Sequence, residues 1–246
     1  MAVTDLSECN VTMSNALTRA SHALTLVEKR VIAAMVAQVD SRKGHSMQAH
    51  LAQFTKLKLH AIDYTETFDV DEKHAYEHLK KAADHLFERY IVIKQPAKKG
   101  EKLTKFRWVS SVTYAEGEGF IELSFTPEVY PHLHALRREY TIYKLKNAAA
   151  LRSTYSWRLY ELAQSWLELC KSGKSVKLQL VDLRLSLDVP EKYTWHDTKK
   201  RALDPAIEEI AQHSGLEITY EVIKTGRSVT ALNIKIKEIE QMKLPL

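Results

Sequence analysis

The amino-acid sequence predicts an α+β protein in which one supersecondary unit occurs twice. Segments with helical spacing of apolar residues alternate with strand-like segments along the 246 residues. In addition, residues 57–73 align with residues 176–192 at a constant offset of 119. Seven of the seventeen aligned positions are identical, in the pairs Lys58/Lys177, Leu59/Leu178, Asp63/Asp182, Asp69/Asp188, Val70/Val189, Glu72/Glu191 and Lys73/Lys192. Such a repeat indicates a duplicated domain, and the chain is long enough to bury two cores.

The first half is expected to begin with one long amphipathic helix over residues 15–40. Its apolar stripe has helical spacing and consists of Leu17, Leu24, Val27, Val31, Ala34 and Met35. A stripe that faces the core is the main interpretation. The seven-residue interval between Leu17, Leu24 and Val31 leaves a short dimerisation seam as an alternative.

Strands and helices then alternate up to residue 136. In chain order we expect a strand, helical turns, a helix and three antiparallel strands, at residues 54–62, 63–68, 71–87, 89–94, 105–115 and 120–125. The inward side chains of the helix over 71–87 are expected to be Leu79, Ala82, Ala83 and Leu86. Thr126 is the expected N-cap of a further helix, which begins at Pro127 and reaches Leu136.

The charged, alanine-rich segment 137–152 is the expected linker between two domains, residues 1–136 and 153–246. The second half repeats the order of parts. We expect a helix, a strand, a short helix, a helix that ends at Ser214, and a hairpin, with the helix at 154–169, the strand at 176–180, the short helix at 181–187 and the hairpin strands at 216–223 and 228–239.

Three cations, Lys199, Lys200 and Arg201, stand near the front of the helix that ends at Ser214. The N-terminus of a helix carries partial positive charge, so cations there are unfavourable unless an anion binds nearby. The apolar stripe Leu79, Ala83, Leu86 matches the stripe Leu203, Ile207, Ile210 only at an offset of 124. The second copy therefore has five extra residues ahead of its buried stripe. On this register the outward residues, including two at the flanks, are Thr194, Asp197, Thr198, Lys200 and Arg201 in the second copy and Lys73, His74, Glu77, Lys80 and Lys81 in the first.

Helix, strand, short helix, turn, exposed helix and antiparallel hairpin is the order of a winged helix. In this variant of the helix-turn-helix the exposed helix enters the major groove and the hairpin, or wing, lies against the backbone or minor groove. Two hairpin ends are cationic, "KKGEK" at 98–102 and "KTGRS" at 224–228. The pattern predicts contacts of DNA with Lys73, His74, Lys80, Lys81, Lys98, Lys99, Lys102, Thr194, Thr198, Lys199, Lys200, Arg201, Lys224, Arg227 and Ser228.

The composition agrees with a polyanion partner without requiring one. Lys plus Arg outnumber Asp plus Glu by 36 to 31, so the net charge is +5 and the pI is near 9.0. Cys9 and Cys170 are far apart and lack metal-ligand spacing, which predicts neither a disulfide framework nor a zinc cluster. We expect no cofactor, no membrane span, no export signal and a cytoplasmic location.

A rolling-circle nicking enzyme is an alternative from another class. His132 and His134 resemble the metal-binding pair of such enzymes, and Tyr143 stands three residues before Lys146, as around their nucleophile. Histidines two apart share a face only on a strand, whereas Pro127 to Leu136 has a helical pattern. We therefore expect no enzyme activity.

Two further motifs are weaker. His74 and His78, one helical turn apart, with His85 further along, suit zinc only poorly, because no cysteine or suitably spaced carboxylates accompany them. The segment "SGKS" is not a P-loop, since Glu168 stands where the first glycine belongs. Neither motif predicts a metal site or nucleotide hydrolysis.

With these residues in view, nearly the whole chain resembles the replication initiators of iteron-containing, theta-replicating bacterial plasmids. The most specific part is "RALDPAIEEIAQHSGLEITYEVIKTGRSVTALNIKIK", preceded by "YSWRLYELAQ". "LTLVEKRVIAAMVAQV" and "LSFTPEVYPHLHAL" are similar to the first domain of that family. The resemblance assigns the basic recognition segment to Lys199, Lys200 and Arg201, and the wing to Lys224, Gly226 and Arg227.

The resemblance implies two winged-helix domains that grip a direct repeat at the origin as a monomer, whereas a homodimer binds an operator and represses synthesis of the initiator. It also implies partners: host chaperones, a host initiator and the replicative helicase. The family often has arginines where this chain has Thr198, Lys199 and Lys200, which puts bidentate reading of guanine at those positions in doubt. A dimeric winged-helix transcriptional regulator remains the alternative within the same fold.

Overall fold

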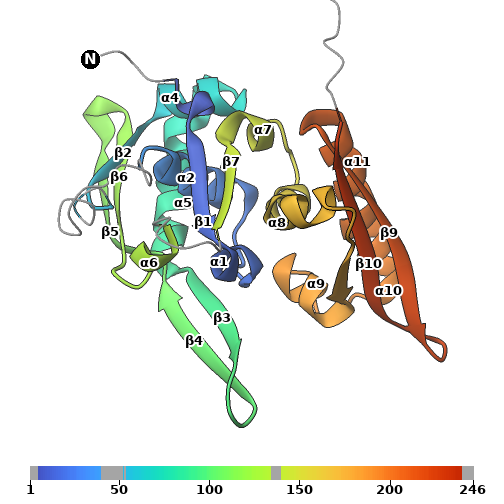
Figure 1. Ribbon diagram of the computed structural model, residues 1–246. Helices are drawn as coiled ribbons and strands as arrows, with labels where there is room; N and C mark the ends of the chain where they lie inside the picture. Colours follow the sequence, from blue (N-terminus) through green and yellow to red (C-terminus); the bar gives the residue numbers. More distant parts are fainter. Residues whose placement is uncertain (1–4, 40–51, 53, 134–139, 240–246) are drawn as a thin grey trace, which may run out of the picture. The chain divides into compact units, whose positions relative to one another are not determined.

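The computed structural model describes residues 5–39, 52, 54–133 and 140–239. The chain divides into two compact units, Met1–Ala149 and Ala150–Leu246 (Figure 1). Both units combine helices with antiparallel strands, so the predicted α+β class is confirmed. Among the described residues, no helix is both long and apolar enough to cross a membrane.

Each unit contains a three-stranded antiparallel sheet of the same topology. In unit 1 the order is β2 (Leu57–His60), β6 (Phe120–Phe125) and β5 (Val109–Ala115). In unit 2 the order is β8 (Val176–Gln179), β10 (Ser228–Glu238) and β9 (Leu216–Thr225). The first strands of the two sheets begin at residues 57 and 176, which is the offset of 119 predicted from the sequence.

A left-handed aspartate ends the short helix of each unit at the same offset. Helix α4 (Ala61–Phe68) is followed by Asp69 with φ 47°, and α9 (Leu180–Ser186) is followed within two residues by Asp188 with φ 53°. Aspartate tolerates this conformation better than most residues. The next backbone N–H donates to an equivalent carbonyl, Val70 to Thr65 at 3.3 Å and Val189 to Arg184 at 2.9 Å. The repeat is therefore confirmed down to a single turn.

The helix that follows this turn, here called the recognition helix, is longer in unit 2. In unit 1 it is α5 (Ala75–Glu88), 14 residues after a 3-10 turn at Glu72–His74. In unit 2 it runs through α10 (Trp195–Thr198), a π-helical turn (Lys199–Leu203) and α11 (Asp204–His213). Between the left-handed aspartate and the first residue of the buried stripe, unit 2 has five more residues (Asp188 to Leu203) than unit 1 (Asp69 to Leu79), as predicted. Five residues exceed one α-helical turn, and the wider π turn takes up the excess.

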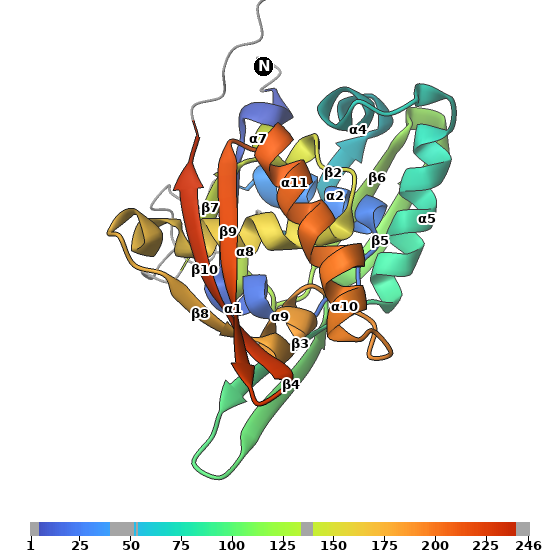
Figure 2. The ribbon, with the colours of Figure 1, turned by 90° about the vertical axis from the view of Figure 1, so that its right-hand side faces the viewer.

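In each unit the recognition helix packs against the sheet, α5 against β5 and β6, and α11 against β9 (Figure 2). The predicted inward residues Leu79, Ala82, Ala83 and Leu86 are all buried. In unit 2 Leu203 and Ile210 are buried and Ile207 is half-buried. Helix α8 (Thr154–Lys171), capped by Ser153, packs against both α11 and β10. Helix α8 thus completes the core of unit 2 together with α11 and the sheet.

The prediction of a single helix over residues 15–40 is wrong, because the helix is interrupted between Ala20 and Thr25. The structure has α1 (Asn15–Arg19) and α2 (Leu26–Ala37), and Ala23 between them has φ 49°. Thr25 starts α2 with a capping box, in which its side chain accepts from the Glu28 N–H. The positions proposed for a dimerisation seam, Leu17, Leu24 and Val31, are buried in the core of unit 1.

The strand expected at 105–115 is two strands of different sheets, divided at the buried Trp108. Strand β4 (Glu101–Arg107) pairs with β3 (Tyr90–Pro96), whereas β5 joins the three-stranded sheet. The β3–β4 hairpin therefore lies outside that sheet and extends away from the rest of unit 1 (Figure 1). Among the described residues of unit 2, no hairpin corresponds to it.

The prediction that a helix begins at Pro127 is also wrong, because the helix begins at Tyr130. Within the described residues it is the single turn α6 (Tyr130–Leu133). The Thr126 side chain does not cap it but donates to the carbonyl of Arg107 at 2.7 Å. Residues 134–136, and with them His134, lie outside the described part of the chain.

The exposed linker predicted at 137–152 is wrong over residues 140–149. Strand β7 (Tyr140–Lys144) pairs in antiparallel register with β1 (Asn10–Ser14) at the other end of unit 1. Helix α7 (Leu145–Ala149) follows and buries Leu145 and Ala148. The division between the units falls after Ala149, and residues 137–139 are outside the described ranges.

Candidate nucleic-acid interface

The recognition helix of unit 2 begins with a capping box between Thr194 and Asp197. The Asp197 N–H donates to Thr194 Oγ1 at 3.2 Å, and the Thr194 hydroxyl donates to Asp197 Oδ2 at 2.7 Å. The Thr194 backbone N–H also donates to Asp197 Oδ2, at 3.2 Å. The two hydrogen bonds that Thr194 donates lower the pKa of the Asp197 carboxyl, and nearby Arg201 adds to the effect. The exposed Thr194 is therefore occupied in capping.

The three cations stand beyond the first helical turn, so the expected conflict with the helix N-terminus is smaller than the sequence suggested. The charge effect of a helix end fades within one turn, and Asp197 supplies an anion inside that turn. Arg201 Nε lies 3.4 Å from Asp197 Oδ1, and its guanidinium lies 5.5 Å from the centroid of the Tyr193 ring. The Arg201 side chain is thus held on the helix while 62% of it stays exposed.

The two lysines of this cluster differ in their surroundings. Lys199 Nζ lies 3.9 Å from Asp204 Oδ2, and both side chains are about half exposed. Lys200 is exposed and forms no ion pair with any residue that the structure describes. A polyanion therefore meets one uncompensated and two partly compensated cations on this helix.

Thr198 is the one predicted contact residue of this helix that the structure excludes from the surface. Its side chain is fully buried, and Thr198 Oγ1 donates to the Thr194 carbonyl at 2.9 Å. The prediction that Thr198 points outward, toward DNA, is therefore wrong. A regular α-helical register continued from Leu203 toward the N-terminus places Thr198 on the outer face, but the π turn at 199–203 rotates the residues before it.

The hairpin β9–β10 forms the wing of unit 2. Thr225 pairs with Ser228 around a tight turn in which Gly226 has φ 61°, a conformation that favours glycine. Lys224, Arg227 and Ser228 are exposed at this end of the hairpin. The structure thus presents two cations beside a recognition helix, at the place where a winged helix meets the DNA backbone.

In unit 1 the predicted residues Lys73, His74 and Lys81 are exposed at the front of α5 and along it. His74 Nδ1 lies 3.8 Å from Glu77. Lys80 is different, because its ammonium lies 2.5 Å from Glu116 in the turn between β5 and β6. The first recognition helix therefore has exposed cations at its start and a neutralised one in its middle.

Unit 1 has two hairpins, and the one identified from sequence as the wing is not the equivalent of β9–β10. The equivalent is β5–β6, whose register with β2 matches that of β10 with β8: Leu57 pairs with Leu123, and Val176 pairs with Ile234. Lys98, Lys99 and Lys102 lie instead at the exposed end of the additional hairpin β3–β4. The assignment of 98–102 as the wing of the first copy is therefore wrong, although the cations do lie at a hairpin end.

The additional hairpin carries charge that the sequence interpretation did not single out. Residues 90–107 hold six Lys or Arg and one Glu, so their net charge equals the +5 of the whole chain. Lys94, Lys105 and Arg107 join the tip lysines, and Lys105 Nζ lies 3.4 Å from the centroid of the Tyr90 ring. The number of cations between residues 94 and 107 was the available signal, but the expected strand boundary at residue 105 divided them between two segments.

The residues proposed for a nicking enzyme do not form a site among the described residues. His132 Nδ1 is hydrogen-bonded to Ser14 Oγ at 2.8 Å, its ring stacks on Phe106, and burial lowers its pKa. Tyr143 is a buried residue of β7, opposite Val11. His134 lies outside the described ranges, and within them no group of three His, Cys, Asp or Glu side chains is arranged to hold a metal ion.

Comparison with known proteins gives two family matches in chain order. Residues 10–164 match "Initiator Replication protein, WH1", and residues 179–236 match "Initiator Rep protein, WH2". An Escherichia coli "Replication initiation protein" is 24% identical over 244 residues, which cover 97% of this chain and 73% of that protein. A second E. coli protein, an uncharacterized 27.6 kDa protein, is 25% identical over 222 residues, covering 88% of this chain and 91% of its own.

One solved structure is similar to the fold over almost the whole chain. It is the crystal structure of the Pi initiator protein in complex with iteron DNA, with a TM-score of 0.73, 18% sequence identity, and coverage of 96% of this chain and 99% of that one. At this identity the likeness concerns the fold, and it agrees with two winged-helix domains in tandem.

Proposed function

Because the chain belongs to the initiator replication protein family, with its two winged-helix domains, we propose that it binds direct repeats at a plasmid origin as a monomer and initiates replication there. The observation that carries the proposal is the duplicated unit, in which each copy presents an exposed cationic recognition helix. The similarity in fold to an initiator solved with iteron DNA supports the same direction. A homodimer that binds an inverted repeat and represses the protein's own gene completes the proposal.

In unit 2 the recognition helix is proposed to enter the major groove. Arg201 is the candidate for base reading, because its guanidinium can pair with O6 and N7 of guanine. Lys199 and Lys200 are proposed as phosphate contacts, since an ammonium lacks the fork geometry for bidentate pairing. Thr194 would lie near the backbone at the start of the helix. The wing residues Lys224, Arg227 and Ser228 are proposed to follow the backbone beside the groove.

In unit 1 we propose backbone contacts through Lys73, His74 and Lys81 on α5, with Lys80 held back by its ion pair. The β3–β4 hairpin, with Lys98, Lys99 and Lys102 at its end, is proposed to contact the DNA backbone as well, independently of base sequence. Contacts distributed in this way predict a strong dependence of affinity on salt. Each phosphate neutralised changes the slope of log affinity against log salt by about 0.9.

The proposed activity involves recognition without cleavage of DNA and takes place in the cytoplasm, where a bacterial plasmid replicates. Host chaperones that release the monomer, a host initiator and the replicative helicase are proposed as partners. These partners are proposed because the chain resembles the family of plasmid replication initiators.

Footprinting on DNA that flanks the protein's own gene tests the proposal. Protection of tandem direct repeats by a species of monomer mass supports an initiator. Protection of a palindrome alone, by a dimer at every concentration, would support a transcriptional regulator of the same fold. Sedimentation of the protein–DNA complex supplies the stoichiometry that separates the two cases.

A further inference from the structure

The wing of unit 1 differs from that of unit 2 in the sign of its charge. The turn of β9–β10 has the sequence KTGRS, whereas the equivalent turn of β5–β6 has the sequence EGEG, residues 116–119. Glu116 and Glu118 are both exposed. A hairpin end with two carboxylates and no cation is poorly suited to a DNA backbone, because like charges repel at short range.

This acidic wing is attached to its own recognition helix. Lys80 Nζ lies 2.5 Å from Glu116 Oε1 and 5.5 Å from the centroid of the Tyr114 ring. One helical turn further along α5, the Asp84 carboxylate accepts a hydrogen bond from the Tyr114 hydroxyl. Two consecutive turns of α5 therefore contact the last residues of β5 and the turn after it.

The pKa shifts of Lys80 and Glu116 both favour the charged form of the residue. The hydrogen bond to Glu116 is the main cause that raises the pKa of Lys80, and the same bond lowers the pKa of Glu116. Burial, and next the hydrogen bond to Asp84, raise the pKa of Tyr114. Lys80 and Glu116 are thus both charged at neutral pH, and each offsets the other.

Unit 2 connects the same helix position to its wing through a carboxylate. At the offset of 124 that aligns the buried stripes, the equivalent of Lys80 is Asp204, which accepts a hydrogen bond of 2.7 Å from Tyr220 on β9. In unit 2 the cations of the recognition helix lie about one turn earlier, where Lys200 forms no ion pair with a described residue and Lys199 Nζ lies 3.9 Å from Asp204 Oδ2. A wing contact at this position is therefore common to both units, but only unit 1 places a lysine in it.

From these contacts we infer that Glu116 occupies Lys80 in place of a DNA phosphate and so limits the affinity of unit 1 for DNA. The inference rests on the proposed function, in which α5 faces DNA. The carboxylate acts in two ways, since its bond to Lys80 must break before the ammonium binds a phosphate, and its own charge repels the backbone. Glu116 thereby limits the affinity of the protein for DNA, and Lys80 makes no contact with a DNA phosphate in the wild-type protein.

Glu116→Gln tests the inference by a gain of binding. We expect its affinity for origin repeats and for scrambled duplex to rise by about two- to fivefold, the range that an exposed ion pair represents. The slope of log affinity against log salt should steepen by about 0.9 as one more phosphate is neutralised. Glu118→Gln is the matched control, because it removes the same charge from the same turn, where Glu118 has no ion pair with a described residue.

Lys80→Gln completes a double-mutant cycle with Glu116→Gln. In the wild-type background it should change affinity by less than about twofold, since Lys80 is already neutralised. In the Glu116→Gln background it should remove the gain in affinity and in slope. Equal effects of Glu116→Gln and Glu118→Gln, or a full loss of one phosphate contact on Lys80→Gln in the wild type, would overturn the inference.

A melting curve separates a structural role of the pair from a masking role. A lower melting temperature of Glu116→Gln, with unchanged affinity of the folded protein, would mean that the pair only attaches the wing, and the inference would fail. The wild-type protein tests the proposed function independently. If the wild type binds the repeats and Glu116→Gln gains nothing, only this inference is wrong; if the wild type binds no DNA, the proposed function is wrong.

Discussion

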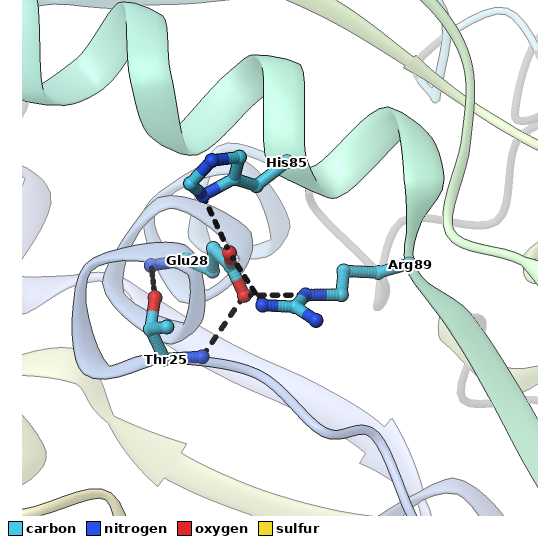
Figure 3. Close-up of polar contacts among 4 residues, drawn as sticks. All are labelled: Thr25, Glu28, His85 and Arg89. Atoms are coloured by element: carbon cyan, nitrogen blue, oxygen red, sulfur yellow. Dashed lines mark hydrogen bonds and ion pairs between the residues drawn. The ribbon is translucent and has the colours of Figure 1, made fainter.

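The carboxylate of Glu28 accepts two hydrogen bonds from the guanidinium of Arg89, at 3.0 Å from Nε and 3.1 Å from Nη2 (Figure 3). Glu28 is fully buried in the first turn of α2, and Arg89 follows the last residue of α5. Thr25 donates its N–H to the same carboxylate, and His85 Nδ1 lies 3.4 Å from it. The pair therefore joins the end of the first recognition helix to the core of unit 1.

Arg89→Leu should destabilise unit 1, because it leaves a buried carboxylate without its charged partner. We expect a loss of about 3 kcal/mol, at the lower end of the range for such pairs, since 34% of the Arg89 side chain is exposed. Arg107→Leu is the control, because it breaks the exposed ion pair with Glu88. It should cost less than about 1 kcal/mol in a urea unfolding experiment. Equal losses in both variants would contradict a special role for Glu28.

His132 should make unit 1 less stable in acid. Burial lowers its pKa below the ordinary value of 6.5, so the unfolded chain binds this proton more readily than the folded one. Stability should therefore fall as the pH drops below about 6.5 and stay level above it. Melting curves between pH 5 and pH 8 measure the effect. His132→Gln should flatten this dependence.

Lys200→Ala and Arg201→Ala should weaken DNA binding in different ways. Loss of a phosphate-facing lysine lowers affinity for all sequences alike and reduces the salt slope by about 0.9. Loss of a base-reading arginine costs roughly 1 to 3 kcal/mol and relaxes preference at one base pair. Salt titrations on specific and scrambled duplexes distinguish the two. Melting temperatures should stay nearly unchanged, with only the contacts of Arg201 to Asp197 and Tyr193 lost. Unchanged binding with lower stability in both variants would make the cluster structural.

The protein should leave DNA uncut. Supercoiled origin plasmid incubated with magnesium or manganese should remain unnicked, since Tyr143 is buried in β7 and His132 is hydrogen-bonded to Ser14. Agarose gels detect a nick directly. Nicking that disappears in Tyr143→Phe or His134→Ala would revive the enzyme alternative.

Residues 150–246 should fold and bind DNA on their own. This fragment contains the whole second repeat, including α8, which covers the sheet, and it begins where the two units divide. Circular dichroism and a binding assay on the purified fragment test the expectation. The complementary cut after Leu136 should fail, because it removes β7 and exposes the edge of β1.

Local sequence patterns determined much of this protein. The repeat at an offset of 119, the two recognition helices, the five additional residues in the second one and the hairpin after Ser214 all follow from residue identities and from spacing within short windows. The cations at 199–201 and at the two hairpin ends were also placed on exposed segments correctly. Such features are visible because helical and strand periodicity depend on near neighbours.

Tertiary structure decided the rest, because strand pairing and side-chain contacts join residues that are distant in sequence. Tyr140–Lys144 is rich in aromatic and β-branched residues, but its strand partner, Asn10–Ser14, lies at the opposite end of the sequence of unit 1 and cannot be identified from a short window. Which hairpin is the wing of unit 1 depends on the pairing of β6 with β2 and β5. The burial of Thr198 follows a π turn that no α-helical periodicity contains. The pairing of Lys80 with Glu116, 36 residues away, is likewise a product of the packing of α5 against β5, so the same cationic residue type that suggested DNA contact is neutralised in the folded chain.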